Sequence, residues 1–337
     1  MKLLRPSTRT RRFALALALG AALLPAPASA SQAPAAAIPP AGIGPGAAPA
    51  GHAIAAAGAI VDLSALHVVA RGDSLASIGA RYGVSTRRVA LENGLDPGKP
   101  LRPGQALQVT ARHVVPPALE AGIVINPPQR MLFLFRAGRV AQAYPAAVGR
   151  PDWQTPLGEF TVANRQVDKT WIVSPSIQEE MRREGKPVLT QVPPGPDNPL
   201  GPRWIGLSMP AIGIHGTNAP SSVYGFRSHG CVRLHSDDVV RLFDAVAVGE
   251  PGRIVYLPVL LARGDDGRIW FEANPDVYRR SGATVATVRA MARDRGIAEE
   301  SIDWSQVATM LRERDGLARE VGVREAEPGS RGEGERG

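Results

Sequence analysis

The sequence predicts a mainly β domain, preceded by a small α+β domain and followed by a short helical segment. Three observations support this prediction. Short apolar runs follow one another at hairpin spacing between residues 122 and 148, which is typical of β structure. Residues 66–110 place two capped helix patterns between two short strand patterns. From Ser281 onward, apolar residues recur at helical spacing instead.

Length and composition allow two modest domains with real cores. The chain has 337 residues, 44% of them hydrophobic. Its 36 glycines and 31 prolines indicate turns and linkers. The formal net charge is +8, but five basic and no acidic residues lie within residues 1–30, which leaves +3 for the rest. Because the rest contains no dense run of Lys and Arg, a nucleic-acid partner is not expected.

Residues 1–30 match the pattern of a signal peptide. A basic start leads into an apolar run from Phe13 to Leu24 and a small-residue end at Ala28-Ser29-Ala30. We expect cleavage after Ala30 and a periplasmic or wall-associated protein, with the choice between Sec and Tat export left open. The apolar run is too short to span a membrane, and no span is expected after cleavage. Residues 31–63 are predicted as a flexible Ala/Pro/Gly linker and residues 323–337 as a disordered tail.

Residues 64–112 are predicted as one compact unit. A strand at 66–69 precedes a helix that Ser74 caps and Gly83 ends, and a second helix that Ser85 caps. The segments HVVARGDSLASIGARYGVS and LENGL…LRPGQALQV resemble a LysM domain. That resemblance implies binding of glycan containing N-acetylglucosamine; the alternative is a module that only spaces the chain. The implied glycan-binding residues are Gly72, Asp73, Ser74, Leu75, Asn93 and Gly94.

Residues 119–260 are predicted as the mainly β domain. Expected strands cover 122–126, 131–135, 140–148, 155–162, 203–209, 211–214 and 253–259. Ser236 is expected as the N-cap of a helix that Gly249 ends. The Pro- and Gly-rich segment 185–202 is interpreted as a rim over a cleft or as a plain surface loop. Residues 261–322 are predicted as a C-terminal extension with helices, the last of them starting at Asp303, and no function is assigned to it.

The central stretch contains Cys231, the only cysteine of the chain, with His215 and His229 upstream. An unpaired cysteine in an exported protein is buried and inert, joined to a partner, or reactive. A thiol attacks as the thiolate, and a neighbouring imidazole can lower its pKa by forming a thiolate–imidazolium pair. The same imidazole can later protonate a leaving amine. This stretch therefore suggests a cysteine nucleophile with a histidine base.

The stretch resembles the YkuD-type L,D-transpeptidase catalytic domain. The matching motifs are His215-Gly216-Thr217-Asn218 and Ser228-His229-Gly230-Cys231-Val232-Arg233. Two further segments are similar to that family, Thr155-Pro156-x-Gly158-x-Phe160 and the run PPGPDNPLG. The resemblance implies a mixed, β-sandwich-like catalytic fold that needs no metal and no organic cofactor.

The resemblance also implies a role for each motif residue. Cys231 is the nucleophile, and His215 is the general base and acid, oriented by the carbonyl of Gly216. The N–H groups of Gly230 and Cys231 form an oxyanion hole. His229 either shapes the site or only supports it, and His235 is expected to be solvated. The implied substrate-binding residues are Arg233, Ser228, Asn218 and Thr217.

The implied reaction is ping-pong acyl transfer on peptidoglycan stem peptides, with release of D-alanine. The acceptor is a diaminopimelate amine or the lysine of an outer-membrane lipoprotein, while water would make the enzyme an L,D-carboxypeptidase. Carbapenems are expected to acylate Cys231. Two rival interpretations are a non-catalytic wall-binding protein and a zinc site built from His215, His229, Cys231 and His235. The spacing of these four residues fits no common zinc pattern.

Overall fold

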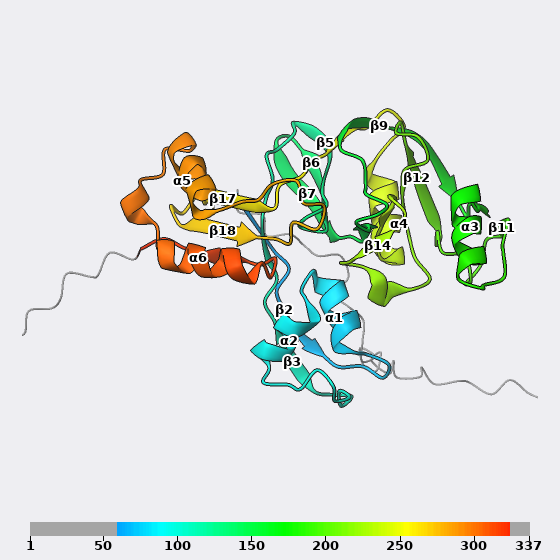
Figure 1. Cartoon of the computed structure of the whole chain (residues 1–337), viewed down its shortest axis with the longest axis horizontal. Coiled ribbons are helices and arrows are strands. Elements are labelled where there is room, and N and C mark those ends of the chain that lie inside the picture. Colours follow the sequence, from blue (N-terminus) through cyan, green and yellow to red (C-terminus); the bar gives the residue numbers. More distant parts are fainter. Residues whose placement is uncertain (1–58, 324–337) are drawn as a thin grey trace, which may run out of the picture. The chain divides into compact units, whose positions relative to one another are not determined.

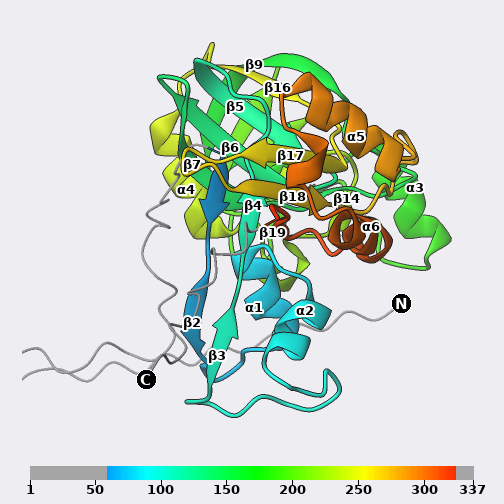
Figure 2. The ribbon, with the colours of Figure 1, turned by 90° about the vertical axis from the view of Figure 1, so that its left-hand side faces the viewer.

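A computed structural model describes residues 59–323 of the chain (Figures 1 and 2). The predicted signal peptide, the linker as far as residue 58 and the tail from residue 324 lie outside the described residues. Within residues 59–323, no helix is long and apolar enough to cross a membrane.

The N-terminal unit has the predicted order of strand, helix, helix, strand. β2 (Ala65–Val68) pairs antiparallel with β3 (Ala106–Val109), and α1 (Leu75–Tyr82) and α2 (Thr86–Glu92) lie between them in sequence. The Ser74 side chain caps α1 in a capping box with Ser77. The prediction of an α+β unit is confirmed, and its apolar side chains form a core with those of the sheet domain.

The last residues of the predicted linker are structured, so the prediction of a flexible linker is wrong there. β1 (Ile60–Asp62) pairs antiparallel with β4 (Arg112–Val114). Val61 is completely buried, and the Asp62 carboxylate accepts a hydrogen bond from Arg112 at 2.8 Å. A three-residue strand next to an Ala-rich run is too short to show the alternation that identifies a strand in the sequence. Its structure depends on pairing with the partner strand.

One eight-stranded mixed sheet forms the framework of the central domain, which confirms the predicted mainly β fold. Its strand order is β15-β13-β12-β9-β16-β5-β6-β7. β13 pairs with β15, and β16 with β5, in parallel; the other neighbours are antiparallel. The strands are β5 (Ala121–Asn126), β6 (Met131–Arg136), β7 (Arg139–Pro145), β9 (Gly158–Val167), β12 (Arg203–Leu207), β13 (Gly213–His215), β15 (Val232–Arg233) and β16 (Pro251–Ile254).

Shorter elements surround the sheet and change several predicted boundaries. β8 (Val148–Gly149) pairs in parallel with β14 (Phe226–Ser228), so the strand expected over 140–148 is two strands. The strand expected over 155–162 begins only at Gly158. The strand expected over 253–259 is likewise divided, because β16 ends at Ile254 and β17 begins at Val259.

The helix after the cysteine motif begins and ends earlier than predicted. α4 covers Ser236–Ala245, and His235 rather than Ser236 is its N-cap residue. The hydroxyl of Ser236 instead donates to the carbonyl of Thr217 at 2.9 Å, which explains why it does not cap the helix. Gly249 belongs to the turn before β16.

His235 is buried, so the expectation of a solvated residue is wrong. Only 6% of its surface is exposed, and Nε2 lies 3.2 Å from the carbonyl oxygen of Ala80 in α1. Nearby, Arg81 pairs with Asp237 at 2.6 Å and with Asp238 at 3.3 Å. These contacts join α1 to the first turn of α4, immediately after the motif strand β15.

The segment between β9 and β12 contains a helix that the sequence did not predict. β10 (Trp171–Ile172) pairs with β11 (Gln191–Val192), and α3 (Pro175–Arg183) lies between them. The long loop predicted over 185–202 therefore includes a strand. The buried amide of Asn198 donates to the carbonyls of Lys169, Val192 and Pro193 and fixes the base of this segment. Ser174 caps α3, Pro175 lies in its first turn and Arg182 and Arg183 lie in its last, so the sequence carried helix signals that were overlooked. No residue of α3 is buried.

The C-terminal extension has its own sheet and core. β17 (Val259–Arg263), β18 (Ile269–Ala273) and β19 (Ala318–Glu320) form an antiparallel sheet, and α5 (Val285–Asp294) and α6 (Trp304–Glu313) pack against β17 and β18 (Figure 1). The predicted helices are confirmed, and β19 was missed. The described residues also contain two single-turn 3₁₀ helices, η1 (Pro220–Ser222) and η2 (Glu299–Ser301).

A buried polar cluster around Glu272 in β18 joins the extension to β4 and to the turn after β5. Its carboxylate accepts hydrogen bonds from Val114 N at 2.6 Å, Gln129 Nε2 at 2.9 Å and Asn274 Nδ2 at 3.0 Å. Glu272, Gln129 and Asn274 are all buried. Because buried donors without acceptors are costly, this one side chain holds three segments together.

Glu272→Ala is expected to lower stability by about 3 kcal/mol, because three buried donors lose their acceptor. Thermal unfolding should show a Tm lower by roughly 6 °C or more. Glu320→Ala on the neighbouring strand β19 is the matched control, since within residues 59–323 its one ion pair is a 3.9 Å contact with Arg268. Equal shifts in the two variants would contradict the role given to Glu272.

Candidate active site

The parallel pairing of β13 with β15 places the motif residues. Ile214 lies opposite Val232, and His215 opposite Arg233. Ile214 and Val232 are fully buried in the sheet core. Since successive side chains of a strand point to opposite faces, His215 and Arg233 lie on the other face. Cys231 directly precedes β15, and the charge of Arg233 lowers the pKa of both His215 and the Cys231 thiol, so Arg233 lies near both. The structure therefore brings the predicted nucleophile, base and anion-binding residue to the β13–β15 strand pair.

His215 is held in one orientation. Its Nδ1 lies 2.7 Å from the carbonyl oxygen of Gly216, as predicted. Because a carbonyl only accepts, Nδ1 carries the hydrogen and Nε2 is the atom that can take up a proton. The ring also stacks on Trp204 of β12, at 6.0 Å between centroids and an angle of 18°. Trp204 was not recognised from the sequence, where it is one tryptophan in an ordinary strand pattern.

Cys231 and His215 are both poised in their neutral forms. Burial, with a smaller contribution from the charge of Arg233, lowers the pKa of His215 to about 3, despite hydrogen bonds to the carbonyls of Gly216 and Pro199. Burial raises the pKa of the Cys231 thiol above its ordinary value, against the opposing effects of the Gly213 backbone and Arg233. The expected thiolate–imidazolium pair is therefore not favoured in the free protein, because the buried His215 ring disfavours the charged imidazolium and the pKa of the thiol is raised.

Arg233 presents a cation without a carboxylate partner. Its Nη1 donates to Ser222 Oγ at 2.8 Å, and its Nε is buried without a partner. It forms no ion pair within residues 59–323. Such an arginine, on the same face as Cys231, is suited to bind a carboxylate.

The loop before Cys231 is fixed by hydrogen bonds from distant segments. The carbonyl of Gly230 accepts from Thr155 Oγ1 at 2.9 Å, and Ser228 Oγ donates to the carbonyl of Cys231. The N–H of Gly230, the expected oxyanion donor, donates to Ser228 Oγ at 3.2 Å. Gly230 has φ +105°, and a Cβ would lie 3.1 Å from Ile212, so only glycine fits this turn without strain.

Tyr278 of the C-terminal extension supports the same loop through hydrogen bonds to Gly149 and Thr155. Its hydroxyl donates to the carbonyl of Gly149 at 2.7 Å and accepts from the N–H of Thr155 at 3.2 Å. Thr155 Oγ1 in turn accepts from the N–H of Gly149 at 2.9 Å while it donates to Gly230. Tyr278 also stacks on Tyr256 at 5.3 Å. The extension thus contributes to the geometry of the cysteine loop, a role that no sequence pattern indicated.

His229 points to α3 and is anchored there. Its Nε2 forms a hydrogen bond with Glu180 Oε2, and its ring packs edge-on against Trp153 at 4.7 Å. Glu180 also pairs with Arg150 at 2.6 Å. Burial raises the pKa of Glu180, but the hydrogen bonds from His229 and Arg150 outweigh it and hold that pKa below its usual value. Glu180 was missed because its helix was not predicted.

Thr217 and Asn218 line a cavity of about 260 Å³, together with residues of the segment 195–202. Thr217 is buried and Asn218 is exposed. The amide of Asn218 donates to the carbonyl of Asp197 at 3.0 Å, and Thr217 Oγ1 accepts from Ala219 N at 2.9 Å. The structure therefore places these two predicted substrate-binding residues at the border of the 185–202 segment.

In the N-terminal unit, the predicted glycan-binding side chains mostly shape their own loops. The Asp73 carboxylate accepts from Ala70 N at 2.8 Å and contacts His67 Nε2 at 2.9 Å. The amide of Asn93 bonds to the carbonyls of Val89 and Gln108 and to the N–H of Gln108, each at 2.8 Å. Ser74 caps α1 and Leu75 is buried, while Gly72 and Gly94 have no side chain to offer. Glycan contacts from these loops would come mainly from the backbone.

Within the described residues, no group of three or more His, Cys, Asp or Glu side chains is arranged to hold a metal ion. The side chains proposed in the zinc alternative instead have separate partners, since His229 bonds to Glu180 and His235 to Ala80.

Comparison with known proteins identifies both domains. Residues 120–256 match the YkuD family, the L,D-transpeptidase catalytic domain, and residues 67–110 match the LysM domain. The chain is 31% identical to the "Probable L,D-transpeptidase ErfK/SrfK" of Salmonella typhimurium over 76% of this chain and 84% of that relative. The chain belongs to the L,D-transpeptidase family.

Other L,D-transpeptidases match over shorter lengths. The "Probable L,D-transpeptidase YcfS" of Escherichia coli is 32% identical over 62% of this chain and 67% of that relative. The "Putative L,D-transpeptidase YkuD" of Bacillus subtilis is 32% identical over 54% of this chain and 93% of that relative. The solved L,D-transpeptidase of Mycobacterium smegmatis is 19% identical and aligns over 46% of this chain and 76% of that one, with a TM-score of 0.34.

The neutral resting state of this L,D-transpeptidase predicts how Cys231 reacts with iodoacetamide. Only the thiolate is alkylated, and the pKa of Cys231 is raised, so the rate should rise about tenfold for each pH unit between 7 and 9. His215 adds no inflection near pH 6.5, because its own pKa is about 3. Mass spectrometry of quenched samples measures the rate. A rate that does not change between pH 6 and 8 would indicate a preformed ion pair and contradict this account.

Tyr278→Phe is expected to destabilise this L,D-transpeptidase by about 1–2 kcal/mol, because the Gly149 carbonyl and the Thr155 N–H lose a buried partner. Thermal unfolding should show a Tm lower by roughly 3–6 °C. Tyr144→Phe is the control, since within the described residues its hydroxyl bonds to the side chains of Gln142 and Arg241 and to no backbone group. A Tm loss no larger than that of the control would argue against the supporting role of Tyr278.

Proposed function

We propose that the chain is an exported peptidoglycan L,D-transpeptidase with Cys231 as its nucleophile. The observation that supports the proposal most is the parallel pairing of His215 with Arg233, directly after Cys231, in which the charge of Arg233 acts on both His215 and the Cys231 thiol. Membership in the L,D-transpeptidase family supports the substrate class. The LysM unit supports attachment to the glycan of the same polymer.

In the acylation step, the Cys231 sulfur attacks the carbonyl carbon of the third stem residue, which we take to be diaminopimelate. His215 Nε2 removes the thiol proton as the bond forms, because both groups are neutral before substrate binds. Collapse of the tetrahedral intermediate breaks the peptide bond to D-alanine, and His215 returns the proton to the leaving amine. The products are a thioester on Cys231 and free D-alanine.

The oxyanion of the tetrahedral intermediate would accept hydrogen bonds from the N–H groups of Gly230 and Cys231. In the free protein the Gly230 N–H is bonded to Ser228 Oγ, so substrate binding has to replace that bond. The Thr155 bond to the Gly230 carbonyl keeps this peptide unit oriented meanwhile. Arg233 would hold a carboxylate of the stem peptide in two hydrogen bonds.

A second amine completes the transfer by attacking the thioester. A diaminopimelate amine of another stem would give a 3→3 cross-link, and the lysine of an outer-membrane lipoprotein would give an anchored protein. Water would give an L,D-carboxypeptidase from the same site. In each case His215 removes a proton from the attacking group and protonates the Cys231 sulfur as it leaves.

Release of D-alanine from a tetrapeptide muropeptide tests this proposal. Wild type should release D-alanine, and Cys231→Ala should reduce release to background. His215→Ala should lower kcat by 10²–10⁴-fold, the usual contribution of a general base. Release by Cys231→Ala equal to that of wild type would refute the nucleophile, and adding an acceptor amine separates transfer from hydrolysis.

A further inference from the structure

A cavity of about 290 Å³ away from Cys231 is lined by four arginines. They come from three regions of the chain: Arg87 and Arg88 from α2, Arg130 from the turn before β6, and Arg314 from the end of α6. None of the four forms an ion pair with a carboxylate in the part of the chain that the structure describes.

Arg130 is the decisive residue of this cavity. Only 8% of its surface is exposed, and its Nε is buried without a hydrogen-bond partner. Its guanidinium lies 3.9 Å from the centroid of the Tyr224 ring and 5.6 Å from that of Phe226, and no carboxylate in residues 59–323 forms an ion pair with it. A buried cation without a hydrogen-bonded anion is costly, so such a side chain is normally paired.

The fold leaves room for this guanidinium. A Cβ on Gly316 would lie 2.8 Å from Arg130 Nη2 and 2.9 Å from the Tyr224 hydroxyl, and Gly316 has φ +81°. The main chain of Arg130 is fixed as well, since its N–H bonds to the carbonyl of Asn126 at 3.0 Å. The absence of a side chain at Gly316 and the main-chain bond of Arg130 therefore fix the position of this guanidinium.

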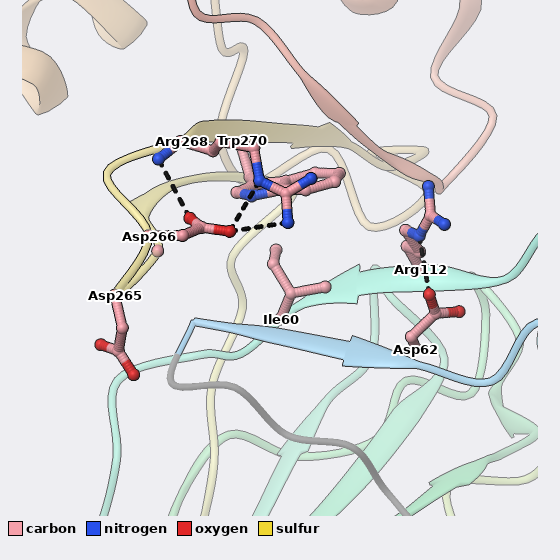
Figure 3. Close-up of a pocket in the computed structure, with 8 residues that line it drawn as sticks. Ile60, Asp62, Arg112, Asp265, Asp266, Arg268 and Trp270 are labelled. Carbon is pink, nitrogen blue, oxygen red and sulfur yellow. Dashed lines mark hydrogen bonds and ion pairs between the residues drawn. The ribbon is translucent and has the colours of Figure 1, made fainter.

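In another cavity, of about 310 Å³, the arginines do have carboxylate partners (Figure 3). There Arg112 pairs with Asp62 at 2.8 Å, and Arg268 pairs with Asp266 at 2.6 Å. Figure 3 shows each of these arginines directed at its own carboxylate. The arginines of the first cavity lack such partners, although Glu313 and Asp315 line it too, because both of these acids pair with Arg319.

We propose that the cavity around Arg130 binds a small organic carboxylate. Four arginines and two acids give the lining a formal net charge of +2, which favours an anion. The apolar part of the lining, rather than charge, favours an organic carboxylate over inorganic phosphate, because phosphate would desolvate its oxygens against apolar groups. Leu91 and Pro275 add apolar wall for a short alkyl group. Arg130 and Arg88 supply the charge-assisted hydrogen bonds.

Titration with isobutyrate, followed by the NMR signals of the Leu91 methyl groups, tests the proposal on the full chain. The Leu91 signals should shift and saturate with a Kd on the order of millimolar. Isobutyramide, the neutral compound of the same shape, should cause no saturable shift. Inorganic phosphate should bind more weakly than isobutyrate, and tighter phosphate binding would overturn the carboxylate assignment.

Arg130→Met should weaken isobutyrate binding at least tenfold, because the main charge-assisted hydrogen bonds are lost. Arg139→Met, an exposed arginine outside the cavity, is the matched control and should bind as wild type does. Arg88→Met should also weaken binding and carries the test if Arg130→Met does not fold. Equal titration of wild type and both cavity variants, or saturable binding of isobutyramide, would contradict the proposal.

Discussion

The parallel pairing of β13 with β15 is the constraint on which the candidate site depends. With Ile214 opposite Val232 and both side chains in the core, the pleat leaves one orientation for His215 and Arg233. A one-residue change of register would exchange the faces of these two side chains and of the apolar ones. The apolar core therefore also fixes which face of the edge strands carries His215 and Arg233.

Support for the cysteine loop comes from elements that are distant in sequence. Tyr278 in the C-terminal extension bonds to Gly149 and to the Thr155 N–H, and Thr155 bonds to the Gly230 carbonyl. Glu180 in α3 bonds to His229 on the other side. The loop is thus held between the extension and α3, which gives the extension a place in the account of the site.

The strand and helix patterns predicted the fold class, and the resemblance to the family implied the contact between His215 and Gly216 that the structure shows. The sequence did not predict the neutral state of Cys231 and His215, because their pKa values depend on burial that tertiary packing creates. The buried position of His235 depends on α1, far away in sequence. Glu180 was missed because α3 was not predicted, although its Ser174 cap and first-turn Pro175 are visible in the sequence.

The central claim is that Cys231 forms a covalent acyl-enzyme with His215 as its base. Intact-mass spectrometry after incubation with a carbapenem tests it most directly, because the thioester is observed without an acceptor or a coupled assay. The account predicts one adduct per chain, located at Cys231 by peptide mapping, and a much slower adduct in His215→Ala. Folded wild-type protein that gains no adduct, or one that gains it at another residue, would contradict the account.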